Sequence, residues 1–149
     1  MSLSELVFEE SLEGIMITDA ENRILKVNDA FSVMTGYEQK DILGLEANIL
    51  KSDVNPSSFY YKMWQKLITQ GQWRGEIWNR TKSSQAIACF LSIKVLYDEQ
   101  SRVKNYIAMY LDITEKKQTQ DEMYYLAHHD TLTKLPNRMQ FNQHVEALI

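Results

Sequence analysis

Disulfides are excluded within this 149-residue sequence, because it contains a single cysteine, Cys89. Proteins of oxidising compartments depend on disulfides far more than cytoplasmic proteins do. We therefore expect a reducing compartment, the cytoplasm. No apolar run approaches the roughly 20 residues that a membrane-spanning helix needs, and no signal peptide is visible at the start. We accordingly expect this part of the chain to make no membrane contact.

Clustered positive charge is also missing. Sixteen lysine and arginine residues stand against twenty aspartate and glutamate residues, which gives a formal net charge of −4. Lys116 and Lys117 are neighbours, whereas Arg74, Arg80 and Arg102 stand alone in the sequence. A surface that binds nucleic acid needs basic residues gathered on one face. We therefore expect no nucleic-acid partner.

Histidine occurs only towards the C-terminal end, at positions His128, His129 and His144. The rest of the chain lacks the base that usually activates a catalytic serine or cysteine. Two adjacent histidines on a helix point about 100° apart, which is poor geometry for holding a metal. The five glycines are spread out and form no loop that could cradle phosphate. These absences argue against a catalytic site and against a metal site.

The first half of the sequence has the pattern of short helices around one hairpin. Residues 3–11 carry apolar side chains at helical spacing. Apolar runs at 15–18 and 24–27 flank a polar turn, which predicts two antiparallel strands. Further helices are expected between Asn28 and Gly36, at 38–43 and at 57–69.

The longest of these predicted helices, 57–69, carries several large apolar side chains around Trp64. Three of them fit a stripe that faces the core, namely Phe59, Met63 and Leu67. We therefore expect this helix to pack against a sheet.

The second half changes to the two-residue period of strands. Strands are expected at 73–80, 86–97 and 103–114. Alternate residues of the last one sort into an apolar set (Val103, Ile107, Met109, Leu111, Ile113) and a more polar set (Lys104, Tyr106, Tyr110, Asp112, Thr114). One face is expected to be buried and the other at least partly polar, as in an antiparallel sheet. With the hairpin, these strands predict an α+β domain with a mostly antiparallel sheet of five strands.

Several stretches together resemble a PAS sensor domain over roughly residues 5–114. They are Gly14-Ile-Met-Ile-Thr-Asp19, Val27-Asn-Asp-Ala-Phe31, Thr35-Gly36-Tyr37 and Gly71-Gln-Trp-Arg-Gly-Glu-Ile-Trp-Asn-Arg80. Asp112-Ile-Thr114 resembles the terminator that closes such domains before a signalling helix. The resemblance implies the PAS fold, with a five-stranded antiparallel sheet, helices on one face and a C-terminal signalling helix. It also implies a ligand site between the sheet and those helices.

A second resemblance begins at Asp130. The run Asp130-Thr-Leu-Thr-Lys-Leu-Pro-Asn-Arg138 looks like the first motif of GGDEF domains, the bacterial diguanylate cyclases, with Lys134 in place of the usual glycine. The Gly-Gly-[Asp/Glu]-Glu-Phe motif that holds substrate and metal in that family is absent from the sequence. We therefore expect a PAS sensor domain with its N-terminal helix at 1–114, a linker signalling helix at 115–129, and the start of a truncated GGDEF domain at 130–149.

The function implied by these resemblances is sensory. A PAS module would pass a signal through its linker helix to a diguanylate cyclase output that makes cyclic di-GMP and is missing from this chain. The chain itself is expected not to be an enzyme. Asp112 and Thr114 lie at the joint between sensor and linker, where Thr114 is expected to cap the helix and the pair to transmit the signal.

A homodimer is expected, because two linker helices would set whether two cyclase domains face each other. The amphipathic helix at 3–11 is one candidate for the dimer surface, through Leu6, Val7 and Phe8. The alternative is that this helix covers its own sheet.

Two cofactors common in PAS domains lack their ligating residues here. Haem in such domains usually has an axial histidine, and all three histidines lie outside the sensor. A flavin that forms a cysteinyl adduct needs a cysteine in the helical region, whereas Cys89 falls on a predicted strand and is expected to be a small buried residue. Neither group is therefore expected.

Non-covalent FAD is the remaining possibility, because a tryptophan and an asparagine line such a site in some redox-sensing PAS domains. Trp73, Gly75, Ile77 and Asn79 share one strand face. Gly75 would leave space beside an aromatic platform, Asn79 would bond a ring edge, and Asn48 would add a polar contact. Alternatively, Trp73 fills the core and Asn79 caps a turn. A redox sensor that binds FAD or another small molecule is the second function considered.

Overall fold

The structure is a computed structural model that describes residues 1–128. The chain divides into two units, Met1–Asp112 and Ile113–Ile149. Position 129 and the predicted start of a GGDEF domain at 130–149 lie outside the described residues.

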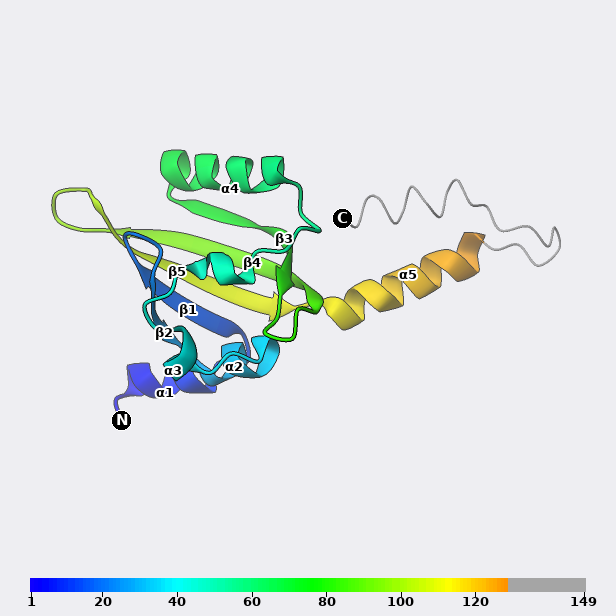
Figure 1. Ribbon diagram of the computed structural model, residues 1–149, viewed down its shortest axis with the longest axis horizontal. Coiled ribbons are helices and arrows are strands. Elements are labelled where there is room, and N and C mark those ends of the chain that lie inside the picture. The colour runs from blue at the N-terminus through cyan, green and yellow to red at the C-terminus, as the bar shows by residue number, and fades with distance from the viewer. Residues whose placement is uncertain (129–149) are drawn as a thin grey trace. The chain divides into compact units, whose positions relative to one another are not determined.

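The first unit contains one sheet with helices packed on it (Figure 1). Its elements are α1 (Leu3–Glu10), β1 (Gly14–Asp19), β2 (Ile24–Val27), α2 (Asp29–Thr35), α3 (Gln39–Ile42), the 3-10 helix η1 (Ala47–Leu50), α4 (Ser57–Gln70), β3 (Gln72–Arg80), β4 (Ala86–Tyr97) and β5 (Val103–Asp112). The five strands pair in the order β2-β1-β5-β4-β3, and every neighbouring pair is antiparallel. The predicted α+β fold with a five-stranded antiparallel sheet is confirmed.

A single apolar core joins the sheet to the helices on its inner face. α2, α3, η1 and α4 each contribute buried side chains to this core, namely Phe31, Ile42, Leu50, Met63 and Leu67. The predicted core positions of Met63 and Leu67 on α4 are therefore confirmed, and Phe59 is partly buried against the same core. Burial of such side chains is the main term that stabilises the domain.

Helix α1 differs from the other helices, because it has no buried residue. It lies beside α2 (Figure 1). Leu6 and Val7 are exposed, whereas Phe8 is half-buried beneath Lys26, whose Nζ lies 4.4 Å from the ring centre. α1 therefore leaves most of its apolar surface uncovered within this unit.

Strand β5 alternates between two faces as predicted, but its buried face is the one that carries tyrosines. Ala108 and Tyr110 are buried towards the helices. Ile107, Met109 and Leu111 of the apolar set point to the opposite face of the sheet, where Leu111 is 44% exposed, whereas Val103 packs against the core. With their neighbours on β1 the first three form an outer apolar band, Ile15, Ile17, Ile107, Met109 and Leu111. Most of the apolar set of β5 thus lies on the outer face of the sheet.

Asn28 ties three segments of the first unit together. It is 1% exposed, and its side chain makes four hydrogen bonds. Its Oδ1 accepts from the backbone N–H of Ile15 at 2.8 Å and of Phe31 at 3.0 Å, and the second bond caps α2. Its Nδ2 donates to the carbonyl oxygens of Phe8 and Glu13, both at 3.0 Å. An amide supplies the acceptor and the two donors that this position needs.

The described part of the second unit is the helix α5 (Thr114–His128), which follows β5 after one residue, Ile113. The helix begins at Thr114 itself, one residue earlier than expected, so Thr114 belongs to its first turn instead of preceding it. Glu115 also lies in the first turn, at the positive end of the helix. Among residues 1–128, no helix is long and apolar enough to cross a membrane.

We predict that Asn28→Ala lowers the free energy of unfolding by about 3 kcal/mol or more, because two N–H groups and two carbonyls lose their partner. Asn105→Ala is the matched control. The one side-chain hydrogen bond of Asn105, from Nδ2 to the Thr18 carbonyl at 2.9 Å, should cost about 1 kcal/mol when removed. Urea denaturation followed by circular dichroism measures both losses. Equal losses would contradict the anchoring role of Asn28.

Candidate functional site

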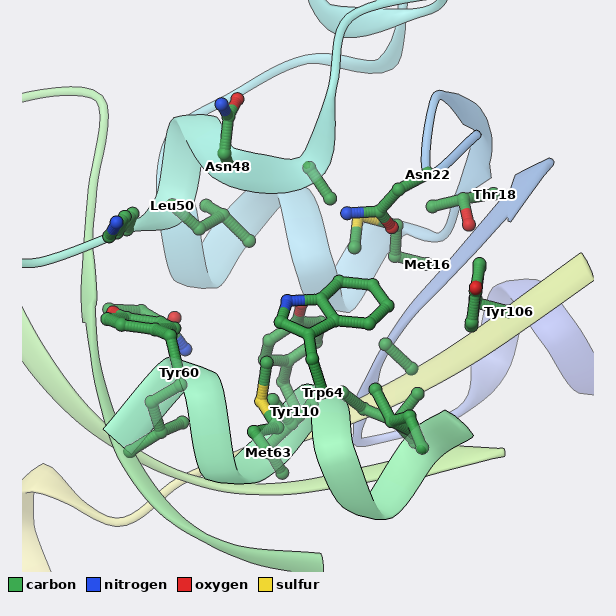
Figure 2. Close-up of a pocket in the computed structure, with 18 residues that line it drawn as sticks. Met16, Thr18, Asn22, Asn48, Leu50, Tyr60, Met63, Trp64, Tyr106 and Tyr110 are labelled. Atoms are coloured by element: carbon green, nitrogen blue, oxygen red, sulfur yellow. The ribbon is translucent and has the colours of Figure 1, made fainter. Parts of the chain in front are cut away.

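A cavity of about 180 Å³ lies between the inner face of the sheet and the helices η1 and α4 (Figure 2). Strands β1, β3, β4 and β5 form its floor, and side chains of η1 and α4 form its walls. Most lining residues are apolar or aromatic, and a few are polar, as in the ligand sites of many proteins. The resemblance to PAS domains implied a site at this place.

Trp64 is the central residue of the cavity. Figure 2 shows its indole ring among the lining residues, with Asn48 and Leu50 on one side of it and Met63 on the other. The ring meets that of Tyr106 edge to face, with 5.5 Å between the ring centres. Sequence reasoning grouped Trp64 with its helix and did not identify it as a cavity residue. No local pattern distinguishes a half-buried tryptophan at a cavity from one in the core.

Asn79 is a buried polar residue at the floor of the cavity. It belongs to β3 and is 5% exposed. Its Nδ2 is buried and has no hydrogen-bond partner. A buried donor without an acceptor costs free energy that most proteins avoid. An acceptor atom brought by a ligand would remove this cost, so Asn79 is the strongest functional candidate in the cavity.

Asn55 is a buried amide whose hydrogen bonds are all made within the protein, and it serves as a comparison for Asn79. Like Asn79 it is 5% exposed. Its Oδ1 accepts from the backbone N–H of Trp78 at 3.0 Å, and its Nδ2 donates to the Trp78 carbonyl and to Tyr60 Oη, both at 2.7 Å. These bonds hold the segment before α4 against β3. The bonded amide of Asn55 makes the unbonded donor of Asn79 the exception.

The other predicted binding residues occupy different surroundings. Asn48 lies on η1, is exposed, and lines the cavity near its rim. Trp73 is not among the cavity-lining residues and packs edge to face on Phe59, with 5.6 Å between the ring centres. A Cβ added at Gly75 would lie 2.9 Å from the Trp73 ring, so that ring already fills the space. The expected open space beside a Trp73 platform is therefore wrong, whereas binding by Asn48 and Asn79 stays a prediction.

Cys89 lies on β4 next to this site and is fully buried. Burial raises the pKa of its thiol to about 11, while the neighbouring Asn79 side chain lowers it by a smaller amount. Asn79 is near enough to act on the sulfur, but its Nδ2 lacks the geometry of a hydrogen bond. The thiol Sγ instead lies 3.9 Å from Met34 Sδ. Cys89 is thus protonated at neutral pH and unreactive, and its interpretation as a small buried residue is confirmed.

Charge is nearly absent from the lining of the cavity. Among the lining residues, Lys51 is the one charged side chain, and its Nζ lies 4.9 Å from the ring centre of Tyr60 at the surface. Burial raises the pKa of the Tyr110 hydroxyl above its ordinary value, so this group also stays neutral. Within residues 1–128, no three histidine, cysteine, aspartate or glutamate side chains gather as a metal site would require. The cavity is therefore a neutral, mostly apolar chamber.

Comparison with known proteins identifies the first unit. The family model described as PAS domain matches residues 12–115. The chain belongs to the PAS domain family. The solved PAS domain of a Colwellia psychrerythraea protein has a TM-score of 0.70 at 20% identity, over 75% of this chain and 95% of that one. An RNA-binding light-oxygen-voltage receptor has a TM-score of 0.69 at 21% identity, over 85% of this chain and 37% of that one. At these identities the likeness shows the fold alone.

The curated relatives of this PAS domain are regulatory and signalling proteins. The nitrogen fixation regulatory protein of Klebsiella oxytoca is 30% identical over 106 residues, which are 71% of this chain and 21% of that protein. The sensor histidine kinase TmoS of Ectopseudomonas mendocina is 31% identical over 122 residues, 78% of this chain and 12% of that protein. The cyclic di-GMP phosphodiesterase PdeR of Escherichia coli K12 is 25% identical over 140 residues, 93% of this chain and 21% of that protein. The chain thus spans about a fifth or less of these relatives.

Asn79 and Asn55 allow a matched test of the unbonded donor. Asn79→Leu should raise the free energy of unfolding of the ligand-free protein by about 1 kcal/mol, because an apolar side chain of similar shape replaces a donor without a partner. Asn55→Leu should lower it by about 3 kcal/mol, because the N–H and carbonyl of Trp78 lose their partner. Urea denaturation measures both changes. A destabilised Asn79→Leu variant would show that the Asn79 amide is satisfied in the native state.

Proposed function

We propose that this chain is the sensory part of a signalling protein, in which a small molecule in the cavity alters a relay through α5 to a GGDEF output domain. The observation that carries this proposal is the double role of β5. Tyr106, Ala108 and Tyr110 line the cavity, and the same strand ends at Asp112, one residue before α5. Any change in packing at the cavity therefore acts on the strand that leads into the linker helix.

Asp112 and Thr114 are the residues proposed to transmit the signal. Asp112 is the last residue of β5 and pairs with the buried Cys89 of β4. Thr114 opens α5. A small rotation at the end of β5 would change the direction in which α5 begins. A joint with two such positions is the kind of two-state element that a switch requires.

Two observations on the segment that follows the PAS match support the proposed output. The run from Asp130 to Arg138 resembles the first GGDEF motif. The similarity to PdeR covers 93% of this chain, so it extends past residue 115, where the PAS match ends. The name of that relative refers to cyclic di-GMP, the product of GGDEF cyclases. We infer that the chain regulates cyclic di-GMP signalling without carrying out catalysis itself.

We further propose that the module acts as a homodimer. On the described surface, α1 exposes Leu3, Leu6 and Val7, and the outer apolar band leaves Leu111 half in solvent. Exposed apolar side chains gathered on one element, as on α1, are typical of an interface. A dimer through α1 would bring two copies of the module, and hence two output domains, together.

FAD is the second candidate ligand, favoured by the unbonded Nδ2 of Asn79, since a flavin ring edge carries acceptor atoms. Its size argues against it. A cavity of about 150 Å³ accommodates benzene, and this cavity measures about 180 Å³. The three fused rings of a flavin therefore do not fit unless Trp64 leaves the cavity. A smaller molecule fits the residues as they stand.

The relay can be tested by changing the phase of α5 in the full-length protein. One alanine inserted after Gln118 rotates the following helix by about 100°, whereas seven inserted residues return it to within about 20° of its original direction. We predict that the single insertion changes the rate of cyclic di-GMP synthesis by at least about fivefold, as a coupling of 1 kcal/mol would. The seven-residue insertion should keep the original rate within about twofold. Similar rates for both insertions would contradict a relay through the helix.

The dimer can be tested by light scattering on the chain of residues 1–149. The measured mass should be near twice the 17.5 kDa of one chain. A double substitution, Leu6→Glu with Val7→Glu, should give the mass of the monomer, because it places charges on the apolar side of α1. Leu12→Glu, at a position that is 94% exposed outside α1, is the control and should stay dimeric. A monomeric wild-type chain would refute the dimer.

A further inference from the structure

We propose that the cavity binds an uncharged molecule with a single aromatic or heteroaromatic ring, whose acceptor oxygen or nitrogen receives a hydrogen bond from Asn79 Nδ2. This inference rests on the proposed sensory function and names the chemical class of its ligand. Four properties of the cavity carry it: its volume, its unbonded donor, its lack of charge and its aromatic walls.

The volume limits the ligand to about one ring. The cavity measures about 180 Å³, slightly more than the roughly 150 Å³ that hold a benzene molecule. One six-membered ring with a substituent of two or three atoms fills that space. Fused systems of two or three rings would have to displace Trp64, which lies across the cavity (Figure 2).

The unbonded amide donor of Asn79 determines which functional group the ligand must have. Asn79 Nδ2 is buried at the floor without a partner. A ligand without an acceptor would leave this donor unsatisfied and gain only apolar contacts. A ligand with a carbonyl oxygen or a ring nitrogen at that point would satisfy the donor, which is worth a factor of about five or more in affinity. The Asn79 amide therefore selects for an acceptor.

The surroundings favour a neutral ligand over an anion. Lys51 is the only charged residue that lines the cavity, and its side chain is held at the surface over Tyr60. A carboxylate placed beside Asn79 would be buried without an opposite charge, which is costly. The same environment already opposes a negative charge on the Tyr110 hydroxyl. An anionic ligand should therefore bind more weakly than a neutral ligand of the same shape.

The walls suit a flat ring. Trp64 and Tyr106 meet edge to face across the cavity, and Tyr60 and Tyr110 add two further aromatic walls. Aromatic rings prefer such edge-to-face or offset contacts with another ring. A planar ligand would extend this arrangement, whereas a bulky aliphatic molecule of the same volume would not.

Three small probes of nearly equal shape separate the effect of the acceptor atom from the effect of charge on binding to the chain of residues 1–149. Acetophenone has a ring and a neutral carbonyl, α-methylstyrene has a methylene group in place of the carbonyl oxygen, and benzoate has a charge. Binding is followed by the NMR signal of the Trp64 indole N–H and by titration calorimetry. We expect acetophenone to bind at least about fivefold more tightly than α-methylstyrene, and more tightly than benzoate. Riboflavin should not bind.

Two variants assign the preference to Asn79. In Asn79→Leu the preference for acetophenone over α-methylstyrene should disappear or reverse. In Gln65→Ala, which removes an exposed amide of α4 that does not line the cavity, the preference should remain. The proposal would be overturned if the wild-type chain bound acetophenone and α-methylstyrene equally, or if the preference survived Asn79→Leu. It would also be overturned if riboflavin bound more tightly than acetophenone, or if folded protein bound none of the probes. None of these results depends on the phase of α5, so the relay and the ligand class can fail separately.

Discussion

Strand β5 is held by two ladders of backbone hydrogen bonds at once, with β1 on one side and β4 on the other. This constraint fixes where its side chains point. Tyr106, Ala108 and Tyr110 are directed to the inner face, and Ile107 and Met109 between them to the outer face. Because the strand cannot turn over without breaking both ladders, the cavity, the outer apolar band and the exit towards α5 are all set by one element.

Three buried asparagines show how the domain divides its polar residues between stability and function. Asn28 and Asn55 are nearly inaccessible and hydrogen-bond to backbone groups, and Asn55 also to Tyr60 Oη, so each joins segments that are distant in the sequence. Asn79 is equally buried, yet its Nδ2 joins nothing. Natural proteins place few groups in that situation, and they cluster where a ligand or a reaction supplies the partner. The contrast separates two amides that build the fold from one whose donor has no structural partner.

Much of the fold follows from sequence periodicity, because strands and helices repeat their apolar positions with different periods. The hairpin, the long helix α4 and the last three strands were predictable for this reason. The orientation of β5 was not, since alternation shows that two faces exist but not which one meets the helices. Its tyrosines face inwards and line a cavity, and an empty space has no signature in the sequence. The same limit explains why Trp64 was missed and why Gly75 was expected to leave room that the Trp73 ring occupies.

The unbonded donor of Asn79 also bears on how a small ligand could shift the state of a sensor. A ligand changes a conformational equilibrium only by the difference in its affinity for the two states. In a chamber with almost no charge, one hydrogen bond is the main directional contact, so a state that aligns Asn79 with the ligand is favoured over a state that does not. Asn79 lies on β3, which pairs with β4, and β4 pairs with β5. Under the proposal, the free energy of that hydrogen bond would act on β3 and pass through these two ladders to β5, the strand that precedes α5.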